Sequence, residues 1–355
     1  MSRNNCCKDS KNERLGQVGG QAVLEGVMMR AGNTVALSVR TLSGNIKTDV
    51  EVLPDKKSVV SKIPLIRGIV NFVTMMKLSI STLNKSVDML GLEEEEPTKF
   101  EKWLEKHFGK SLTAIVTAIG TVLGFALSIL LFMFIPKEVS NLIFGDSTGW
   151  WMLLESAVSG ILRILIFLAY IWGVAFMPDI KKTFQYHGAE HKSVFCHEKK
   201  LDLTVENVMK QSRFHPRCGT SFLVIMMIIG IIIGLPLVNI QNMFLRLGVS
   251  LLTLPLVVGV GYEFIRFAGK HDNFLTRALS APGLWIQRLT TKEPTKDQIE
   301  VAIISLKASL PDIYPEISDI LEAQKEAENK SGETNEVSDA ENETDSENTN
   351  EEDAK

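Results

Sequence analysis

The sequence predicts an α-helical polytopic membrane protein with four membrane-spanning helices, a small N-terminal β-hairpin region and amphipathic surface helices. Three observations predict it: long uncharged apolar runs in the middle of the 355 residues, a short alternating pattern near the N-terminus, and an acidic polar end. The net charge of −4 gives no basic surface for phosphate backbones, so we expect no nucleic-acid partner.

The N-terminal region reads as short strands and turns. Residues 1–14 are expected to be flexible, and residues 15–60 to form a cytoplasmic β-rich segment. Thr34–Arg40 and Ile46–Val52 have strand composition, and the second alternates apolar with polar residues. Ser43, Gly44 and Asn45 between them favour a turn, so the two strands are predicted to form a β-hairpin.

Amphipathic helices are predicted for residues 61–110, because apolar residues from Ile63 to Leu90 recur at helical spacing. The apolar positions that define this side are Ile66, Ile69, Val70, Val73, Met76 and Ile80. Polar residues on the other side make a helix lying on the membrane surface a better description than a spanning helix.

The membrane domain is predicted for residues 111–265. Its four expected spans are Leu112–Ile135, Trp150–Phe176, Phe222–Ile240 and Phe244–Phe264. The first has about 24 uncharged residues, enough for a hydrocarbon core of roughly 30 Å, and Pro136 is expected to end it. Pro236 and Pro255 interrupt the last two, which membrane helices tolerate where neighbouring groups satisfy the freed carbonyls.

Basic residues predict the orientation of these spans. They flank the first span, fill the loop 178–221 and follow the fourth span; they are Lys99, Lys102, Lys106, Lys110, Lys181, Lys182, Lys192, Lys199, Lys200, Lys210, Arg213, Arg217, Arg266, Lys270 and Arg277. Because lysine and arginine concentrate in cytoplasmic loops, both termini and the loop 178–221 are predicted to be cytoplasmic. We therefore expect a multi-pass protein of the plasma membrane.

The C-terminal part is predicted to contain cytoplasmic helices over residues 266–322. An amphipathic surface helix is expected from Phe264 to Leu289, and a further helix from Thr295 through Ser309. Residues 323–355 are dominated by Asn, Glu, Ser, Thr and Asp, so we expect a disordered acidic tail that cannot bury enough apolar surface to fold.

The sharpest chemical motif is His187-Gly188-Ala189-Glu190-His191 in the loop 178–221. On a helix, His187, Glu190 and His191 share one face. Two imidazoles one turn apart can bind a divalent ion such as Zn²⁺, and the carboxylate can accept a proton from water that the ion activates. The spacing is the H-x-x-E-H pattern of inverted zinc peptidases, although Gly188 weakens the helix by about 1 kcal/mol.

A third and fourth ligand are predicted downstream at His215 and Cys218. A set with both would be closed and structural, whereas a set of three would leave a coordination position for water. The alternative interpretation is a solvated loop near lipid headgroups with no metal, since His, Glu and Lys are common there.

Glu25 and Arg30 are lone charges around an apolar, glycine-bracketed segment. One interpretation brings Glu25 to the metal site as a ligand or base, with Arg30 orienting an anionic group. The other, which we favour, leaves both paired or exposed at a sheet surface.

Charges inside the expected spans form a further feature. They are Glu155, Arg163, Arg246 and Glu263. Arg163 is nearest to mid-span, so it is the charge that we expect to be buried against a partner or a polar cavity. Such a cavity keeps a transport or channel role open.

Several motifs together resemble one family. Residues 19–30, 186–192, 215–221, 281–285 and 290–294 are similar to motifs of the YqhQ-type family of bacterial membrane proteins, over about residues 15–310. The resemblance implies a predicted metal-dependent enzyme. The family motifs include His187, Glu190, His191, His215 and Cys218, which supports a shared site.

These observations predict a membrane-embedded metal-dependent enzyme, a hydrolase, facing the cytoplasm. Its substrate would be a lipid, a lipid-linked intermediate or a membrane peptide, with Glu190 as general base. The alternative is a non-catalytic membrane protein, such as a channel, transporter component or assembly factor, with a structural metal site or none.

Overall fold

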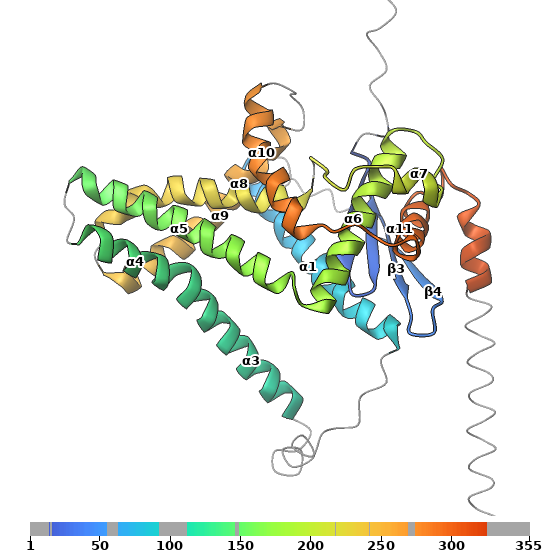
Figure 1. The fold of residues 1–355 in the computed structure, drawn as a ribbon, viewed down its shortest axis with the longest axis horizontal. Helices are drawn as coiled ribbons and strands as arrows, with labels where there is room; N and C mark the ends of the chain where they lie inside the picture. Colours follow the sequence, from blue (N-terminus) through green and yellow to red (C-terminus); the bar gives the residue numbers. More distant parts are fainter. Residues whose placement is uncertain are drawn as a thin grey trace, which may run out of the picture.

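The structure is a computed structural model, and it describes residues 14, 16–54, 63–91, 112–145, 149–216, 218–240, 242–268 and 274–324. The flexible terminus expected at residues 1–14 and the acidic tail expected from residue 323 lie almost wholly outside these residues. A head built around a β-sheet lies at one end of the molecule, and an elongated set of apolar helices extends from it (Figure 1).

The sheet is a four-stranded antiparallel meander in the order β1-β2-β3-β4. Its strands are β1 (Val18–Val23), β2 (Gly26–Ala31), β3 (Thr34–Arg40) and β4 (Ile46–Val52). The predicted hairpin is β3 and β4, with the bounds expected from the sequence. The sheet is larger than predicted, because β1 and β2 extend it by two strands.

Helices cover both faces of this sheet, which explains why β2 was missed. Helix α1 (Ile66–Leu90) lies on one face, and α6 (Pro178–Glu198) with α11 (Lys296–Ser309) lies on the other. Met28 packs in the cluster with α1, and its neighbour Met29 packs in the cluster with α6 and α11. A strand buried on both faces reads as a continuous apolar run and lacks the alternation that marks a half-buried strand. We call the sheet with α1, α6 and α11 the head.

Helix α1 joins the head to the apolar helices, and it ends at Gly91 in the left-handed conformation. Gly68 lies so close to α9 (Met243–Ala268) that a Cβ added there would be 2.7 Å from Tyr262. The guanidinium of Arg67 pairs with the carboxylate of Glu263, which also lies on α9. Apolar side chains at helical spacing remain exposed on α1: Ile66, Val70, Val73, Met76, Ile80, Leu83 and Val87. This exposed stripe agrees with the predicted amphipathic helix.

The remaining apolar elements form what we call the apolar bundle. They are α3 (Leu112–Ile129), the π-helix η3 (Leu130–Phe134), α4 (Ile135–Phe144), α5 (Trp150–Val174), α8 (Gly219–Gly234), the 3₁₀ helix η4 (Leu235–Asn239) and α9 (Met243–Ala268). Three helices of the described chain are long and apolar enough to cross a membrane: residues 118–144, 150–174 and 244–264. The apolar helix at 222–237 is shorter, so the third predicted span is the exception.

Pro136 does not end the first apolar helix, contrary to the prediction. The helix continues through α4, and the π turn just before the proline has its Ile135 N–H bonded to the carbonyl of Leu130. Proline lacks an N–H and clashes with the preceding turn, and a wider turn at that point accommodates its ring without a break.

The region expected as a loop at residues 178–221 is largely helical, with α6 followed by α7 (Val205–Met209). The predicted surface helix at 264–289 is divided between the end of α9 and α10 (Phe274–Thr290). Helix α11 begins with a capping box at Thr295 and Gln298 and ends at Ser309, as predicted.

Candidate metal centre

Helix α6 carries the His-Glu-His motif on the face that meets the sheet and the C-terminal segment. His187 and His191 lie one turn apart with ring centroids separated by 4.4 Å. The Oε2 atom of Glu190 lies 3.8 Å from the Nε2 atoms of both imidazoles. The helix thus brings two imidazoles and one carboxylate to a common point, as their spacing predicts.

Backbone carbonyls orient both imidazoles. The Nδ1 atom of His187 lies 2.9 Å from the carbonyl oxygen of Thr290, and that of His191 lies 2.5 Å from the carbonyl oxygen of Arg213. A carbonyl oxygen only accepts hydrogen bonds, so each Nδ1 carries the proton and each Nε2 carries a lone pair. This is how metal-ligating histidines are commonly held.

Cys218 completes a group of three donor atoms. Its Sγ lies 3.2 Å from Nε2 of His187, and the donor atoms of Cys218, His187 and His191 all lie within 4.8 Å of one another. Two ligands of a tetrahedral zinc ion, with bonds of about 2.0 Å to nitrogen and 2.3 Å to sulfur, would be about 3.5 Å apart. The Nε2 atom of His191 is buried without a hydrogen-bond partner. The residues present therefore fit a zinc ion.

The position of Cys218 follows from helix capping. It is the N-cap of α8, where its sulfur accepts a hydrogen bond from the backbone N–H of Thr220. The N-terminus of a helix favours negative charge, and a thiolate is the form of cysteine that binds metal. The donor group therefore lies at the end of an apolar helix.

The group is nearly closed to solvent. Side-chain exposure is 13% for His187, 8% for Glu190 and 2% for His191. Strand β1 closes one wall, because a Cβ added at Gly20 would lie 2.7 Å from Cγ of Glu190. The apolar, glycine-bracketed segment around Glu25 and Arg30 thus contacts the site through Gly20.

Gly188 is required by a close backbone approach. A Cβ added there would lie 2.1 Å from the carbonyl oxygen of Lys292, whose N–H donates to the carbonyl of Phe184 at 2.8 Å. Gly188 has a low helix propensity, but because it has no side chain the segment 290–294 can pack directly against α6. That segment supplies the carbonyl that holds His187.

An ion-pair network supports the other imidazole, and the sequence did not reveal it. Glu293 pairs with Nζ of Lys192 at 2.7 Å and with Nε of Arg213 at 3.3 Å. Arg213 also donates to the carbonyl of Thr291, and its own carbonyl accepts from His191. The one available signal was that residues 290–294 belong to a family motif, but no spacing rule connects them to His191.

His215 lies beside the group but does not join it in the described chain. Its ring centroid is 5.7 Å from that of His191, and its Nε2 lies 3.3 Å from Oε2 of Glu198, a residue for which we predicted no role. Gln287 brackets its backbone, accepting from the N–H and donating to the carbonyl, both at 2.8 Å. Of the four predicted ligands, the structure brings together His187, His191 and Cys218.

Glu25 is not among the donor atoms that lie together, and both Glu25 and Arg30 contact other groups, so the structure gives no support to Glu25 as a ligand or base. Glu25 pairs with Nζ of Lys182 at 2.7 Å and accepts from the hydroxyl of Tyr186 at 3.4 Å. Arg30 donates to the carbonyl of Gly32 at 3.0 Å. Both are partnered near the sheet surface, as the favoured interpretation expects.

Comparison with known proteins places this chain in a family. Residues 63–312 match the family described as "Protein of unknown function (DUF1385)". The chain is also similar to "Uncharacterized protein YqhQ" of Bacillus subtilis (strain 168), with 36% identity over 309 residues that cover 85% of this chain and 94% of that protein. No solved structure matches the chain. The resemblance drawn from the motifs is therefore confirmed.

Proposed function

The chain belongs to the DUF1385 family, and from the geometry of its candidate metal centre we propose that it is a membrane-embedded, metal-dependent hydrolase. It acts at the cytoplasmic face on a membrane-associated substrate: a lipid, a lipid-linked intermediate or a membrane peptide. The observation that carries the proposal is the pair of imidazole Nε2 lone pairs that face Cys218 and a buried carboxylate.

Each residue has a distinct role in this proposal. His187, His191 and Cys218 hold the ion, and nitrogen and sulfur donors suit Zn²⁺ best among common divalent ions. Such an ion supplies Lewis acidity and makes water a nucleophile near neutral pH. Glu190 accepts the proton from the attacking water and returns it to the leaving group. A set of three protein ligands would leave room at the ion for the attacking water.

Contacts within the head support the predicted topology. Strands β2 and β3 pack against α11, and α6 packs against β1 and α11, so all of these elements lie on the same side of any membrane. The chain between β4 and α6 then crosses twice, through α3–α4 and α5. Between α6 and α11 it must also cross an even number of times, so α8 pairs with α9. The apolar helix at 222–237 is shorter than the other three, so its assignment as a span rests on this even number of crossings and not on its length.

The position of the donor group supports a membrane-associated substrate. Cys218 caps α8 on the side of the head, so the group lies where an apolar helix meets polar structure. A substrate anchored in the membrane would reach this level without leaving the lipid, which favours lipids and membrane peptides over soluble metabolites.

A non-catalytic protein with a structural metal is the second candidate. The observation that favours it is that the donor group joins α6, the start of α8 and the segment at Thr290, with His191 only 2% exposed. In that case the ion fastens the head to the apolar bundle, and Glu190 only completes the shell.

Glu190→Gln separates the two candidates. The purified protein in detergent is incubated with a bacterial membrane lipid extract and with membrane peptides, and products are followed by mass spectrometry. The hydrolase proposal expects the variant to keep its metal and to lose product formation by at least 100-fold. Turnover equal to that of the unchanged protein, with metal still bound, would leave only the structural role.

A further inference from the structure

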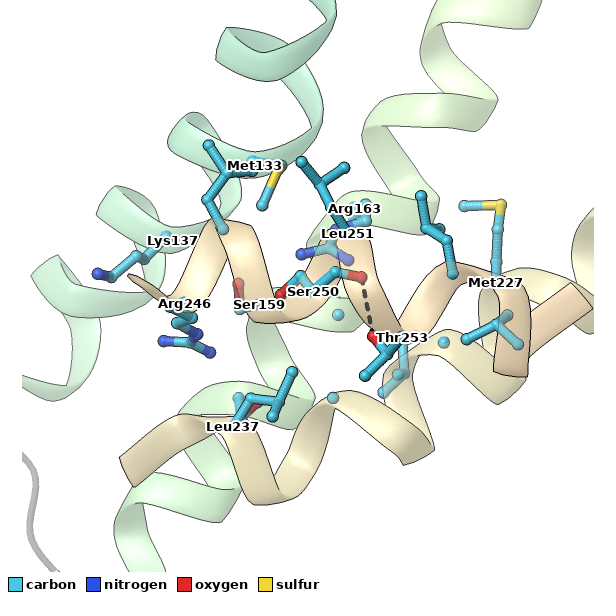
Figure 2. Close-up of a pocket in the computed structure, with 18 of the residues that line it drawn as sticks. Met133, Lys137, Ser159, Arg163, Met227, Leu237, Arg246, Ser250, Leu251 and Thr253 are labelled. Carbon is cyan, nitrogen blue, oxygen red and sulfur yellow. Dashed lines mark hydrogen bonds between the residues drawn. The ribbon is translucent and has the colours of Figure 1, made fainter. Parts of the chain in front are cut away.

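A cavity of about 410 Å³ lies within the apolar bundle. Residues of α3, η3, α4, α5, α8, η4 and α9 line it (Figure 2). Its volume is in the range of small-molecule sites in proteins, roughly 300–1,000 Å³. The proposed hydrolytic chemistry uses none of its residues.

Three cationic side chains line this cavity from three different helices. They are Lys137 on α4, Arg163 on α5 and Arg246 on α9, and no Asp or Glu is among the lining residues that the structure describes. Within the described residues, no hydrogen bond or ion pair joins the side chain of any of the three. The Nε atom of Arg163 is buried and has no partner.

The cavity therefore carries excess positive charge. Arg163 and Arg246 lie near enough for their charges to repel, and Glu155 acts on Arg246 with opposite sign. One carboxylate offsets one of the three cations. Charges at membrane depth are costly and normally face a partner or a polar cavity, so the remaining charge calls for an anion from outside the chain.

The rest of the lining is suited to hydrocarbon. It consists mainly of Met, Leu and Ile side chains, with Met227 drawn at one end of the cavity in Figure 2 and Lys137 and Arg246 at the other. Leu251 and Leu254, which line the cavity, are each about half exposed. The cavity thus has a wall that borders the lipid phase, which a free aqueous anion would not use.

We propose that this cavity binds an anionic amphiphile, whose phosphate or carboxylate contacts Arg163, Arg246 and Lys137. Its hydrocarbon chain lies along the methionine and leucine side chains of α8 and α9. Ser159 and Ser250, which line the cavity near the cations, add hydroxyl donors to the head group. The proposal rests on the membrane placement in the proposed function, but not on the metal or on hydrolysis.

The test uses the full chain in detergent and three probes: dioctanoyl-phosphatidylglycerol, dioctanoyl-phosphatidylcholine and inorganic phosphate. Binding is measured by native mass spectrometry and by the shift in Tm. The variants are Arg163→Gln and Arg246→Gln, with Arg163→Lys retaining the charge. Arg266→Gln is the matched control, because this exposed arginine lies on α9 outside the cavity.

The proposal expects the phosphatidylglycerol to bind, and the phosphatidylcholine to bind at least tenfold more weakly. Arg163→Gln and Arg246→Gln should each weaken phosphatidylglycerol binding at least tenfold, whereas Arg163→Lys and Arg266→Gln should change it less than threefold. Equal binding of the two lipids, or equal loss in Arg266→Gln, would overturn the proposal. Phosphate binding as tight as that of phosphatidylglycerol would make the site one for a free anion and would also overturn it.

Metal content measured on the same samples keeps the two proposals apart. A Gln variant that retains its metal has kept the head folded, so loss of lipid binding there reports on the cavity. Lipid binding without metal would contradict the hydrolase alone, and metal without lipid binding would contradict the cavity proposal alone.

Discussion

The head and the apolar bundle differ in whether their charged side chains have partners. In the head, buried charges meet partners from distant parts of the chain: Glu198 pairs with His215, and Lys192 pairs with Glu293. In the apolar bundle, Arg163 and Arg246 line a cavity without a hydrogen-bonded partner among the described residues. Around the donor group, charged side chains are therefore paired with partners of opposite charge. Around the cavity, positive charge is in excess.

This difference shows what each region is built to hold. In the head, the backbone carbonyls of Thr290 and Arg213 hold two imidazoles in one tautomer, as a preorganised cation site requires. In the apolar bundle, uncompensated cations remain stable only if a mobile partner neutralises them. The two proposals follow from this difference: a cation in the first region and an anionic amphiphile in the second.

Glycine substitutions compare the rigidity of the two regions, and we expect the largest effect in the head. Gly188→Ala should lower the free energy of unfolding by at least about 3 kcal/mol, because its Cβ would meet the backbone oxygen of Lys292. Gly160→Ala in the apolar bundle meets only side-chain atoms of Ile231, which can move, so about 1 kcal/mol is expected. Thermal unfolding in detergent measures both.

Gly19→Ala is the matched control, because a Cβ added at Gly19 has nothing within 4 Å. It should change stability by less than about 0.5 kcal/mol. Gly188→Ala should also release metal. Equal stability of the Gly188 and Gly19 variants would show that the segment 290–294 does not pack as described.

Acid should weaken the head through His197. Burial lowers the pKa of His197 to about 4 from 6.5, and its ring contacts the hydroxyl of Tyr314 at 2.9 Å. Between these two values the unfolded chain binds a proton that the folded chain does not, so stability falls as pH decreases from about 6.5 to about 4. The loss is at most about 3 kcal/mol.

The measurement is the free energy of unfolding from pH 7 to pH 4 for the unchanged protein and for His197→Gln. The difference between the two proteins isolates this residue from the other histidines of the head. A pH dependence that is identical in both would contradict the buried neutral imidazole.

The junction between the head and the apolar bundle should contribute less. Arg67 and Glu263 are 19% and 26% exposed, and two hydrogen bonds join them. We expect a measurable favourable coupling from a double-mutant cycle with Arg67→Ala and Glu263→Ala. A coupling near zero would indicate that α1 is held to α9 by apolar packing alone.

The exposed pair of Glu25 and Lys182 should contribute least. Their side chains are 28% and 55% exposed, so solvent and salt screen the attraction. We expect Lys182→Ala to change stability by less than about 1 kcal/mol, with the effect lost in 1 M NaCl. A larger, salt-insensitive loss would contradict the description of this contact as a screened surface pair.

Local patterns predicted the fold where one physical signal dominated. The alternation in Ile46–Val52 and the start of a helix after Pro294 and Thr295 gave β4 and α11 correctly, because both signals arise within a few residues. Strand β2 was missed because its burial on both faces comes from helices far along the chain. Pro136 was misjudged because a π turn is not encoded by any simple spacing.

The donor group was predictable only in part for the same reason. The spacing of His187, Glu190 and His191 places them on one helical face from local geometry alone. The choice between His215 and Cys218 depends on Glu198 and Gln287, which meet His215 only in the folded chain.

Elemental analysis tests the central claim most directly. The account predicts about one zinc ion per chain in the purified full-length protein, its loss in His187→Ala, His191→Ala and Cys218→Ala, and its retention in His215→Ala. The last variant is the matched control, since it removes an imidazole beside the donor group without removing a donor atom. Metal retained at full stoichiometry in His187→Ala, or absent from the unchanged protein, would contradict the account.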